Sequence, residues 1–263
     1  MRIGYWIKYF GYVGAFLAMT RRVVRVPTIW LFSRLGFAAK TRPAAPGTNG
    51  GWFAPTGRRH MQLSRFMEES GIPPDARILD VGCGPGWLIQ ELVRRGYGNV
   101  AGCDWKAAEP DFGFPYTRVD LNQDGLSAFS DGQYDVVLAS EVLEHLENPA
   151  HILRELRRVA GPRGHVFITI PNCWNLFQRV VFLLSGNSSR YRSARVSPPF
   201  SHISMFTSDI MESLTDRAQL QLVELRGDFV LFWDHFWGSG TNPLFTYDLM
   251  YHFVPTDGRI PKA

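Results

Sequence analysis

The feature that most constrains this chain is the alternation of strand-like and helix-like segments that begins near residue 51. Five apolar runs have the length and composition of buried strands, and helical patterns separate several of them. These runs read RILDVG, NVAGCD, YTRVDL, YDVVLAS and HVFITIP. Strands that alternate with helices predict an α/β fold, a doubly wound, mostly parallel sheet with helices on both faces. Ligands of such sheets bind beyond the carboxyl ends of the strands, so we look there for functional residues.

The clearest helix signal lies between the fourth and fifth of these runs. Asn148 is a favourable N-cap residue, and Pro149 follows it at the first helical position. The pattern ends at Gly161. The sequence therefore predicts a helix that buries the apolar residues spaced along it: Ile152, Leu153, Leu156 and Val159.

A glycine-rich turn follows the first strand-like run, in RILDVGCGPGWLIQEL at residues 77–92. The turn that binds a dinucleotide pyrophosphate needs a small residue where this chain has Trp87, and Pro85 removes a backbone donor from it. Asp80 also ends the strand with a negative charge. The turn therefore favours a ligand with a positive centre, which would bind Asp80 and approach closely over three glycines: Gly82, Gly84 and Gly86.

Acidic residues at the ends of the next two strand-like runs indicate which other groups this ligand carries. Asp104 is placed to bind two ribose hydroxyls. Asp120 is placed to accept from an adenine amino group, with Leu121 against the ring. An ammonium group, a ribose and an adenine without phosphate together describe S-adenosylmethionine. Alternatively, both carboxylates are ordinary cap or turn residues, and the glycine turn is only a tight connection.

Four stretches together resemble the class I S-adenosylmethionine-dependent methyltransferases, in particular the UbiG-like and MetW-like group. They are ILDVGCGPG, CD at 103–104, VDLN at 119–122 and SEVLEHLENPAHILRELRRV at 140–159. The resemblance covers roughly residues 60–230. It implies a Rossmann-like, seven-stranded sheet with an antiparallel last hairpin, expected in LQLVELR and DFVLFW around Gly227. It also implies a cofactor site made of Asp80, Gly82, Cys83, Gly84, Gly86, Asp104, Trp105, Asp120, Leu121, Ser140 and Glu141.

Two histidines are the candidates for a catalytic base. Methyl transfer from a sulfonium needs an oriented nucleophile, and histidine can take the proton of a hydroxyl acceptor near neutral pH. His145 lies just beyond the fourth strand-like run, and His202 follows the segment after the fifth. The alternative roles are structural, with His145 packed at a helix start and His202 hydrogen-bonded in a loop. No carboxylate cluster like that of metal-dependent catechol methyltransferases stands out, so we expect no metal.

Residues 173–204 are the expected lid over the methyl acceptor. A strongly apolar helical stripe comprises Leu176, Phe177, Val180, Val181 and Leu184. The arginines that follow it are Arg190, Arg192 and Arg195. We expect an amphiphilic acceptor, with its apolar part under the helix and an anionic group near the arginines. The alternative is a helix buried in the domain and followed by a solvated loop.

The beginning of the chain is a basic arm. Its first 67 residues carry 11 Lys or Arg and no Asp or Glu, which leaves 17 basic and 24 acidic residues elsewhere, a net charge of −7. Residues 1–37 also carry an amphipathic, aromatic-rich helical pattern, which predicts contact with an anionic membrane surface. Two alternatives remain. The arm binds nucleic acid through its charges and aromatic rings, or it packs on its own domain or a partner chain.

These observations predict an arm and linker at residues 1–50, a methyltransferase domain at 51–240 and a C-terminal extension at 241–263. The expected activity is methyl transfer from S-adenosylmethionine to oxygen on a lipid-like, quinone-like or glycan-linked small molecule. Three scattered cysteines and an uncharged run of only 12 residues near the start favour the cytoplasm, at the inner face of the membrane. Two other functions stay open: a MetW-like partner of a biosynthetic enzyme that binds the cofactor without turnover, and an RNA methyltransferase.

Overall fold

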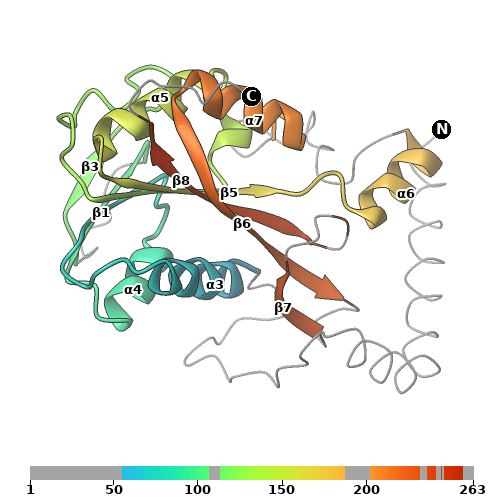
Figure 1. Ribbon diagram of the computed structural model, residues 1–263, viewed down its shortest axis with the longest axis horizontal. Coiled ribbons are helices and arrows are strands. Elements are labelled where there is room, and N and C mark those ends of the chain that lie inside the picture. The colour runs from blue at the N-terminus through green and yellow to red at the C-terminus, as the bar shows by residue number, and fades with distance from the viewer. Residues whose placement is uncertain are drawn as a thin grey trace. The chain divides into compact units, whose positions relative to one another are not determined.

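The computed structural model describes residues 55–106, 113–186, 202–231, 236–240, 244 and 246–256. Within these ranges, helices and strands alternate along the chain as the sequence predicts (Figure 1). The predicted arm at residues 1–37 lies outside the described residues, and so do Arg190, Arg192 and Arg195.

The centre of the fold is one mixed sheet with the strand order β3-β2-β1-β4-β5-β8-β6-β7. Its parallel strands are β1 (Arg77–Val81), β2 (Asn99–Asp104), β3 (Tyr116–Arg118), β4 (Val136–Ser140) and β5 (His165–Pro171). Beyond β5, the strand β8 (Asp248–Pro255) runs antiparallel to both β5 and β6 (Leu220–Leu231). The predicted doubly wound, mostly parallel sheet with an antiparallel end is therefore confirmed. The short β7 (Phe236–Gly240) adds an eighth strand to the predicted seven.

The antiparallel strands are formed by other residues than the sequence predicts. LQLVELR and the start of DFVLFW, predicted as two strands with a turn at Gly227, form the single strand β6. Its partner β8 comes from residues 241–263, predicted as an extension. Gly227 serves close packing, because a Cβ atom there would lie 2.0 Å from Thr246 Cγ2. The hairpin assignment was wrong because a glycine inside a strand signals close approach as well as a turn.

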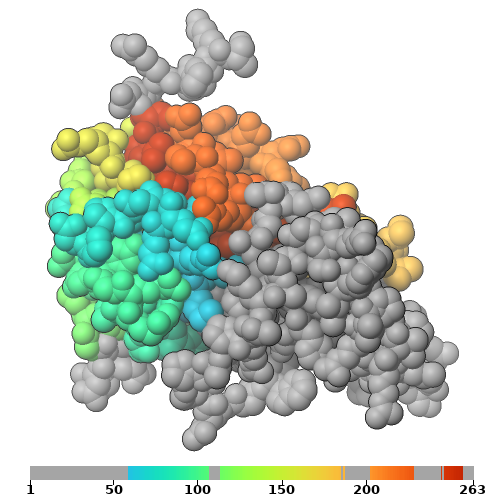
Figure 2. Space-filling view, turned by 60° about the horizontal axis from the view of Figure 1, so that its bottom comes forward, coloured from blue at the N-terminus to red at the C-terminus, as the bar shows by residue number. Residues whose placement is uncertain are grey.

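Helices cover both faces of the sheet. The helices α3 (Pro55–Glu69) and α4 (Trp87–Arg94) lie on one face, and α5 (Pro149–Ala160) and α7 (Ser208–Arg217) lie on the other (Figure 1). Figure 2 shows the first face from outside, where α3 and α4 lie side by side. Neighbouring residues of β1 serve opposite faces: Ile78 belongs to the core beneath α3 and α4, and Leu79 belongs to the core beneath α5.

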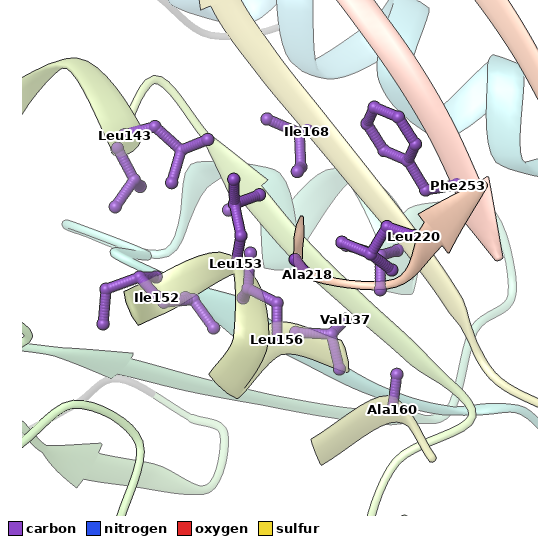
Figure 3. Close-up of a cluster of buried hydrophobic side chains, with 14 of the residues drawn as sticks. Val137, Leu143, Ile152, Leu153, Leu156, Ala160, Ile168, Ala218, Leu220 and Phe253 are labelled. Carbon is purple, nitrogen blue, oxygen red and sulfur yellow. The ribbon is translucent and has the colours of Figure 1, made fainter. Parts of the chain in front are cut away.

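The helix predicted from Asn148 is confirmed as α5. The Asn148 side chain accepts a hydrogen bond from the backbone N of His151, and Pro149 occupies the first turn. All four predicted apolar side chains are buried. Figure 3 shows Leu153 and Leu156 packed with Val137 of the sheet. Each such side chain contributes about 1.5–3 kcal/mol by leaving water, so this face holds the sheet and the loops at its edge firmly together.

Two further helices follow strands at the carboxyl edge of the sheet. The one-turn helix η1 (Leu143–His145) comes directly after β4, and α6 (Leu176–Ser185) comes after β5. Figure 1 shows α6 beyond the end of β5, outside the two helical layers. Among the described helices, none is both long and apolar enough to cross a bilayer.

Candidate functional site

The glycine turn between β1 and α4 is shaped by positive φ angles, which are 71° at Gly82, 51° at Gly84 and 79° at Gly86. At Gly82 a Cβ atom would lie 2.6 Å from Val142, and at Gly86 it would lie 2.5 Å from Phe114. At Gly84 it would meet nothing within 4 Å. Gly82 and Gly86 are therefore required for packing, whereas Gly84 faces open space that a ligand can enter.

The carboxylates that end β1 and β2 lie beside this turn. Asp104 Oδ2 accepts a hydrogen bond from Gly84 N at 2.9 Å, and Oδ1 accepts one from Lys106 N at 3.2 Å. Asp80 is buried, and burial together with the charge of Asp104 raises the pKa of Asp80 to about 8. A ligand with a positive charge would relieve this cost. The turn and its two carboxylates thus fit S-adenosylmethionine, which carries an ammonium and a sulfonium group.

The predicted adenine-binding residues follow β3. Asp120 lies beyond the last residue of that strand, Arg118, and its Oδ1 accepts a hydrogen bond from Asn122 N at 3.0 Å. This is an Asx-turn, so the turn role that the sequence left open for Asp120 is present. Leu121 is half-buried and packs against the core beneath α5. Trp105, next to Asp104, exposes 45% of its surface and offers an aromatic face at this edge.

Cys83, also predicted in the cofactor site, is buried in the glycine turn. Its Sγ would lie 2.7 Å from a Cβ atom at Gly102, so it packs against β2. Burial raises the pKa of the Cys83 thiol, and the charges of Asp80 and Asp104 raise it further. The side chain is therefore an unreactive packing group in the wall of the turn.

The chain turns sharply after β4, at Glu141. Its φ of 57° is unusual for a residue with a side chain. Glu141 N donates to Thr169 O at 3.0 Å and to Thr169 Oγ1 at 3.1 Å, and Ser140 Oγ lies 3.0 Å from the same hydroxyl. Strand β5 thus fixes both residues. Because Val142 packs on Gly82, this loop lies directly beside the glycine turn.

The two predicted histidines lie together, beside the loop that follows β4. The rings of His145 and His202 lie edge to face, with centroids 4.7 Å apart. Glu144 carries the third polar side chain of the cluster, and its carboxylate is fully buried. Its Oε1 lies 3.9 Å from His202 Nε2, and its carbonyl accepts hydrogen bonds from Ile203 N and Ser204 N. The last two bonds attach the segment that bears His202 to the loop that bears His145.

The environment of Glu144 disfavours a negative charge. Burial and the neighbouring Glu141 raise its pKa well above the usual value. A histidine that becomes protonated, or a bound cation, would stabilise the carboxylate. Single ligand atoms of Glu144, His145 and His202 lie within 4.8 Å of one another, a spacing that could accommodate a metal ion. The absence of a metal remains a prediction, which chelation followed by addition of magnesium would test.

The buried guanidinium of Arg59, on α3, supports the loop that follows β4. Arg59 donates from Nε and Nη2 to Asp248 Oδ2 at 3.0 and 2.8 Å, and Nη2 lies 3.4 Å from Glu141 Oε2. Burial disfavours the guanidinium charge, but Asp248 and Glu141 outweigh it and raise the pKa of Arg59. Arg59 therefore links the strained turn at Glu141 to β8.

Sequence reasoning missed three residues of this arrangement. Glu144 had a signal, because Glu141, Glu144 and His145 stand within about one helical turn in SEVLEHL. Arg59 and Asp248 had none, since their pairing depends on how α3 and β8 pack on the sheet.

Comparison with known proteins shows the family of this chain. A protein-family model described as a methyltransferase domain matches residues 57–225. Among curated proteins, a ubiquinone biosynthesis O-methyltransferase of Acinetobacter baumannii is 32% identical over 123 residues, which are 43% of this chain and 51% of that protein. The chain thus spans about half the length of the curated relatives it matches.

Solved structures share the fold. A methyltransferase from Thermotoga maritima, described as a possible histamine N-methyltransferase, aligns with a TM-score of 0.56 and 11% identity over 76% of this chain and 89% of that one. The magnesium protoporphyrin IX methyltransferase of Synechocystis, with bound SAH, aligns with a TM-score of 0.52 and 15% identity over 76% and 84%. At such identities the likeness shows the fold alone. With the family model covering more than half of its length, the chain belongs to the methyltransferase domain family, as a class I, S-adenosylmethionine-dependent member.

Proposed function

We propose that this chain transfers a methyl group from S-adenosylmethionine to a hydroxyl oxygen of an amphiphilic small molecule that is lipid-like, quinone-like or glycan-linked. One observation carries the proposal: the loop of Glu144 and His145 meets His202 and packs on the glycine turn through Val142. A proton acceptor next to the cofactor turn is what a hydroxyl acceptor needs. The name of the curated relatives, ubiquinone biosynthesis O-methyltransferase, supports oxygen as the acceptor atom and a quinone-like ring.

The residues around the glycine turn would bind the cofactor. When bound, S-adenosylmethionine supplies an electrophilic methyl group on a positively charged sulfur. Asp80 would pair with its ammonium group, and Asp104 would accept from the ribose hydroxyls with its remaining lone pairs. Asp120 would accept from the adenine amino group. The other members of the proposed site shape the turn and line the ring: Gly82, Cys83, Gly84, Gly86, Trp105, Leu121, Ser140 and Glu141.

The histidines and Glu144 would handle the proton of the acceptor. His202 would take the hydroxyl proton, and the imidazolium so formed would be stabilised by Glu144, whose Oε1 lies 3.9 Å from Nε2. His145, edge to face with His202, would restrict the orientation of that ring. The Glu144 carboxylate would be stabilised most once His202 is charged. Glu144 and His202 together would therefore favour removal of the proton from the acceptor.

The acceptor would be held from the segment after β5. Arg190, Arg192 and Arg195 would bind its anionic group, and the basic arm at residues 1–37 would keep the enzyme at the inner face of an anionic membrane. The composition of both segments supports this assignment.

The experiment is to incubate the full chain with methyl-labelled S-adenosylmethionine and a cell extract, then to separate lipids, soluble small molecules and nucleic acids. Label in the lipid or small-molecule fraction is the expected result. His202→Ala should lose most of the transfer, while His151→Ala, at an exposed position on α5, should retain it. Label in RNA would replace the proposal by RNA methylation. Cofactor binding without label in any fraction would replace it by the role of a non-catalytic partner.

A further inference from the structure

The helix α6 turns a polar side chain inward, and so does its N-cap residue. Asn175 and Gln178 are buried, with exposed fractions of 5% and 2%. The Asn175 amide donates to Thr246 O at 3.0 Å and to Asn172 O at 3.1 Å, and its Oδ1 accepts from Gln178 N. The first turn of α6 is therefore fastened to the domain by hydrogen bonds.

The outward side of α6 is apolar. Phe177 is 66% exposed, Leu183 is 83% exposed and Leu184 is 76% exposed. The neighbouring side chains that are also exposed are Leu176, Val180 and Phe182. A helix on a water-facing surface normally buries its apolar side and exposes its polar side. Here the arrangement is inverted, which marks this face as one that an apolar environment covers.

We propose that α6 seats the methyltransferase domain on an anionic lipid bilayer. The charges of the sequence on either side of the helix favour a bilayer over a protein partner. Residues 172–208 contain no Asp or Glu and four arginines, namely Arg179, Arg190, Arg192 and Arg195. Bulky aliphatic side chains flanked only by positive charge are the composition of helices that lie in the boundary between lipid headgroups and acyl chains.

The start of α6 is also suited to that boundary. Trp174 is 40% exposed, and indole rings favour the headgroup level of a bilayer. Arg179 Nε donates to the backbone carbonyl of Trp174 at 2.7 Å, which holds a positive charge near the start of the helix. With 10 residues the helix is about 15 Å long, roughly half the thickness of the hydrocarbon layer. It would therefore lie along the membrane surface.

The position of α6 would bring the proposed active site close to the membrane surface. The helix follows β5, which is parallel to β1 and β4, so it leaves the sheet at the same edge as the glycine turn and the histidines. An amphiphilic acceptor could then reach the site without leaving the lipid. This route rests on the proposed function, whereas the exposed side chains and the charges do not.

The test is flotation of the full chain with vesicles of phosphatidylglycerol and phosphatidylethanolamine, and with phosphatidylcholine alone. We expect binding to the anionic vesicles. Leu183→Ser together with Leu184→Ser should lower the apparent partition coefficient about tenfold or more. The control is Leu222→Ser with Val223→Ser on β6, an apolar pair that is 47% and 54% exposed, which should leave binding unchanged. Binding of S-adenosylhomocysteine should be equal in all three proteins, which shows that each is folded.

Several results would overturn the inference. One is that the wild-type chain does not float with anionic vesicles. Another is that the α6 pair and the β6 pair reduce binding equally, or that only changes in the arm, such as Trp6→Ser with Phe10→Ser, abolish it. A third is that the α6 pair converts a wild-type dimer into a monomer and leaves vesicle binding intact, since α6 would then contact a second copy. Failure of methyl transfer would affect the proposed function alone.

Discussion

Arg59 on α3 and Asp248 on β8 are 189 positions apart in the chain, yet they form a buried pair in which two guanidinium nitrogens donate to one carboxylate oxygen. The same guanidinium lies 3.4 Å from Glu141, where the backbone after β4 is strained. The pair thus connects α3 and β8 to the loop that carries Glu144 and His145.

Breaking this pair should destabilise the fold strongly. Arg59→Gln removes the guanidinium charge that pairs with the buried carboxylate of Asp248, so we expect the free energy of unfolding in urea to fall by about 3–5 kcal/mol. The matched control is Arg77→Gln, because Arg77 pairs with Asp135 where both side chains are about half exposed. That change should have little effect. If both variants lost the same free energy of unfolding, the buried pair would stabilise the fold no more than the exposed pair does.

Substitution of two glycines in the same turn should give opposite outcomes. Gly84→Ala meets no atom within 4 Å and carries only backbone strain of about 1–2 kcal/mol, but its methyl group enters the space proposed for the cofactor. We expect a modest loss of stability and a clear loss of S-adenosylhomocysteine binding by calorimetry. Gly82→Ala collides with Val142 and should mainly destabilise the fold. Unchanged ligand affinity in Gly84→Ala would place the cofactor elsewhere.

Asp80 should make the ligand-free protein less stable as the pH rises. Its pKa is raised from 3.8 to about 8 by burial and by Asp104, so the folded state binds the proton more tightly than the unfolded state does. The resulting stabilisation is complete below about pH 4 and is lost as the pH rises through 8. We expect Asp80→Asn to flatten this part of the stability curve in thermal unfolding from pH 5 to 9.

The same residue should couple ligand binding to proton release. At pH 7 the ammonium group of S-adenosylhomocysteine would lower the pKa of Asp80 and expel its proton. Calorimetric titrations in two buffers of different ionisation enthalpy should therefore give different heats for the wild type and similar heats for Asp80→Asn. Buffer-independent heats in the wild type would argue against contact between Asp80 and the ammonium group.

The pair formed by His165, at the start of β5, and His252, on β8, should limit the stability of the fold in acid. His165 Nδ1 and His252 Nε2 lie 2.9 Å apart, so at least one ring must be neutral. Burial lowers the pKa of His252 to about 4, with a further contribution from His165, and burial also lowers the pKa of His165. For a histidine, a lowered pKa means that stability is complete above about pH 6.5 and is lost as the pH falls toward 4. Replacing His252 by Phe should weaken this dependence, and an unchanged acid transition would contradict the assignment.

Glu144 should matter for turnover more than for folding. Because burial and Glu141 raise its pKa, a neutral isostere removes an electrostatic cost. We expect Glu144→Gln to keep or increase stability in urea, and to slow methyl transfer by about 10²–10⁴-fold through the loss of support for the proton acceptor. Affinity for S-adenosylhomocysteine should not change. A variant with full turnover would leave Glu144 a structural role only.

The sequence by itself determined the features that depend on neighbouring residues. The cap at Asn148, the helical spacing of Leu153 and Leu156, and the glycine turn are all local signals, and each is present as predicted. Asp80 and Asp104 could also be placed together, because the carboxyl ends of parallel strands share one edge. The fold class and the shape of the glycine turn therefore followed from short stretches of chain.

Only the tertiary structure decided the features that depend on how distant segments pack. In the sequence Gly227 indicates a turn, but in the structure Thr246 packs against it within a strand. Strand β8 lies between β5 and β6, although the sequence predicted its residues to be a C-terminal extension. The stripe of α6 carries the periodicity of a buried helix, yet all of its residues except Val181 are exposed, because buried Asn175 and Gln178 occupy the inner side. Periodicity fixes which residues share a face, but the packing of the whole domain decides which way that face points.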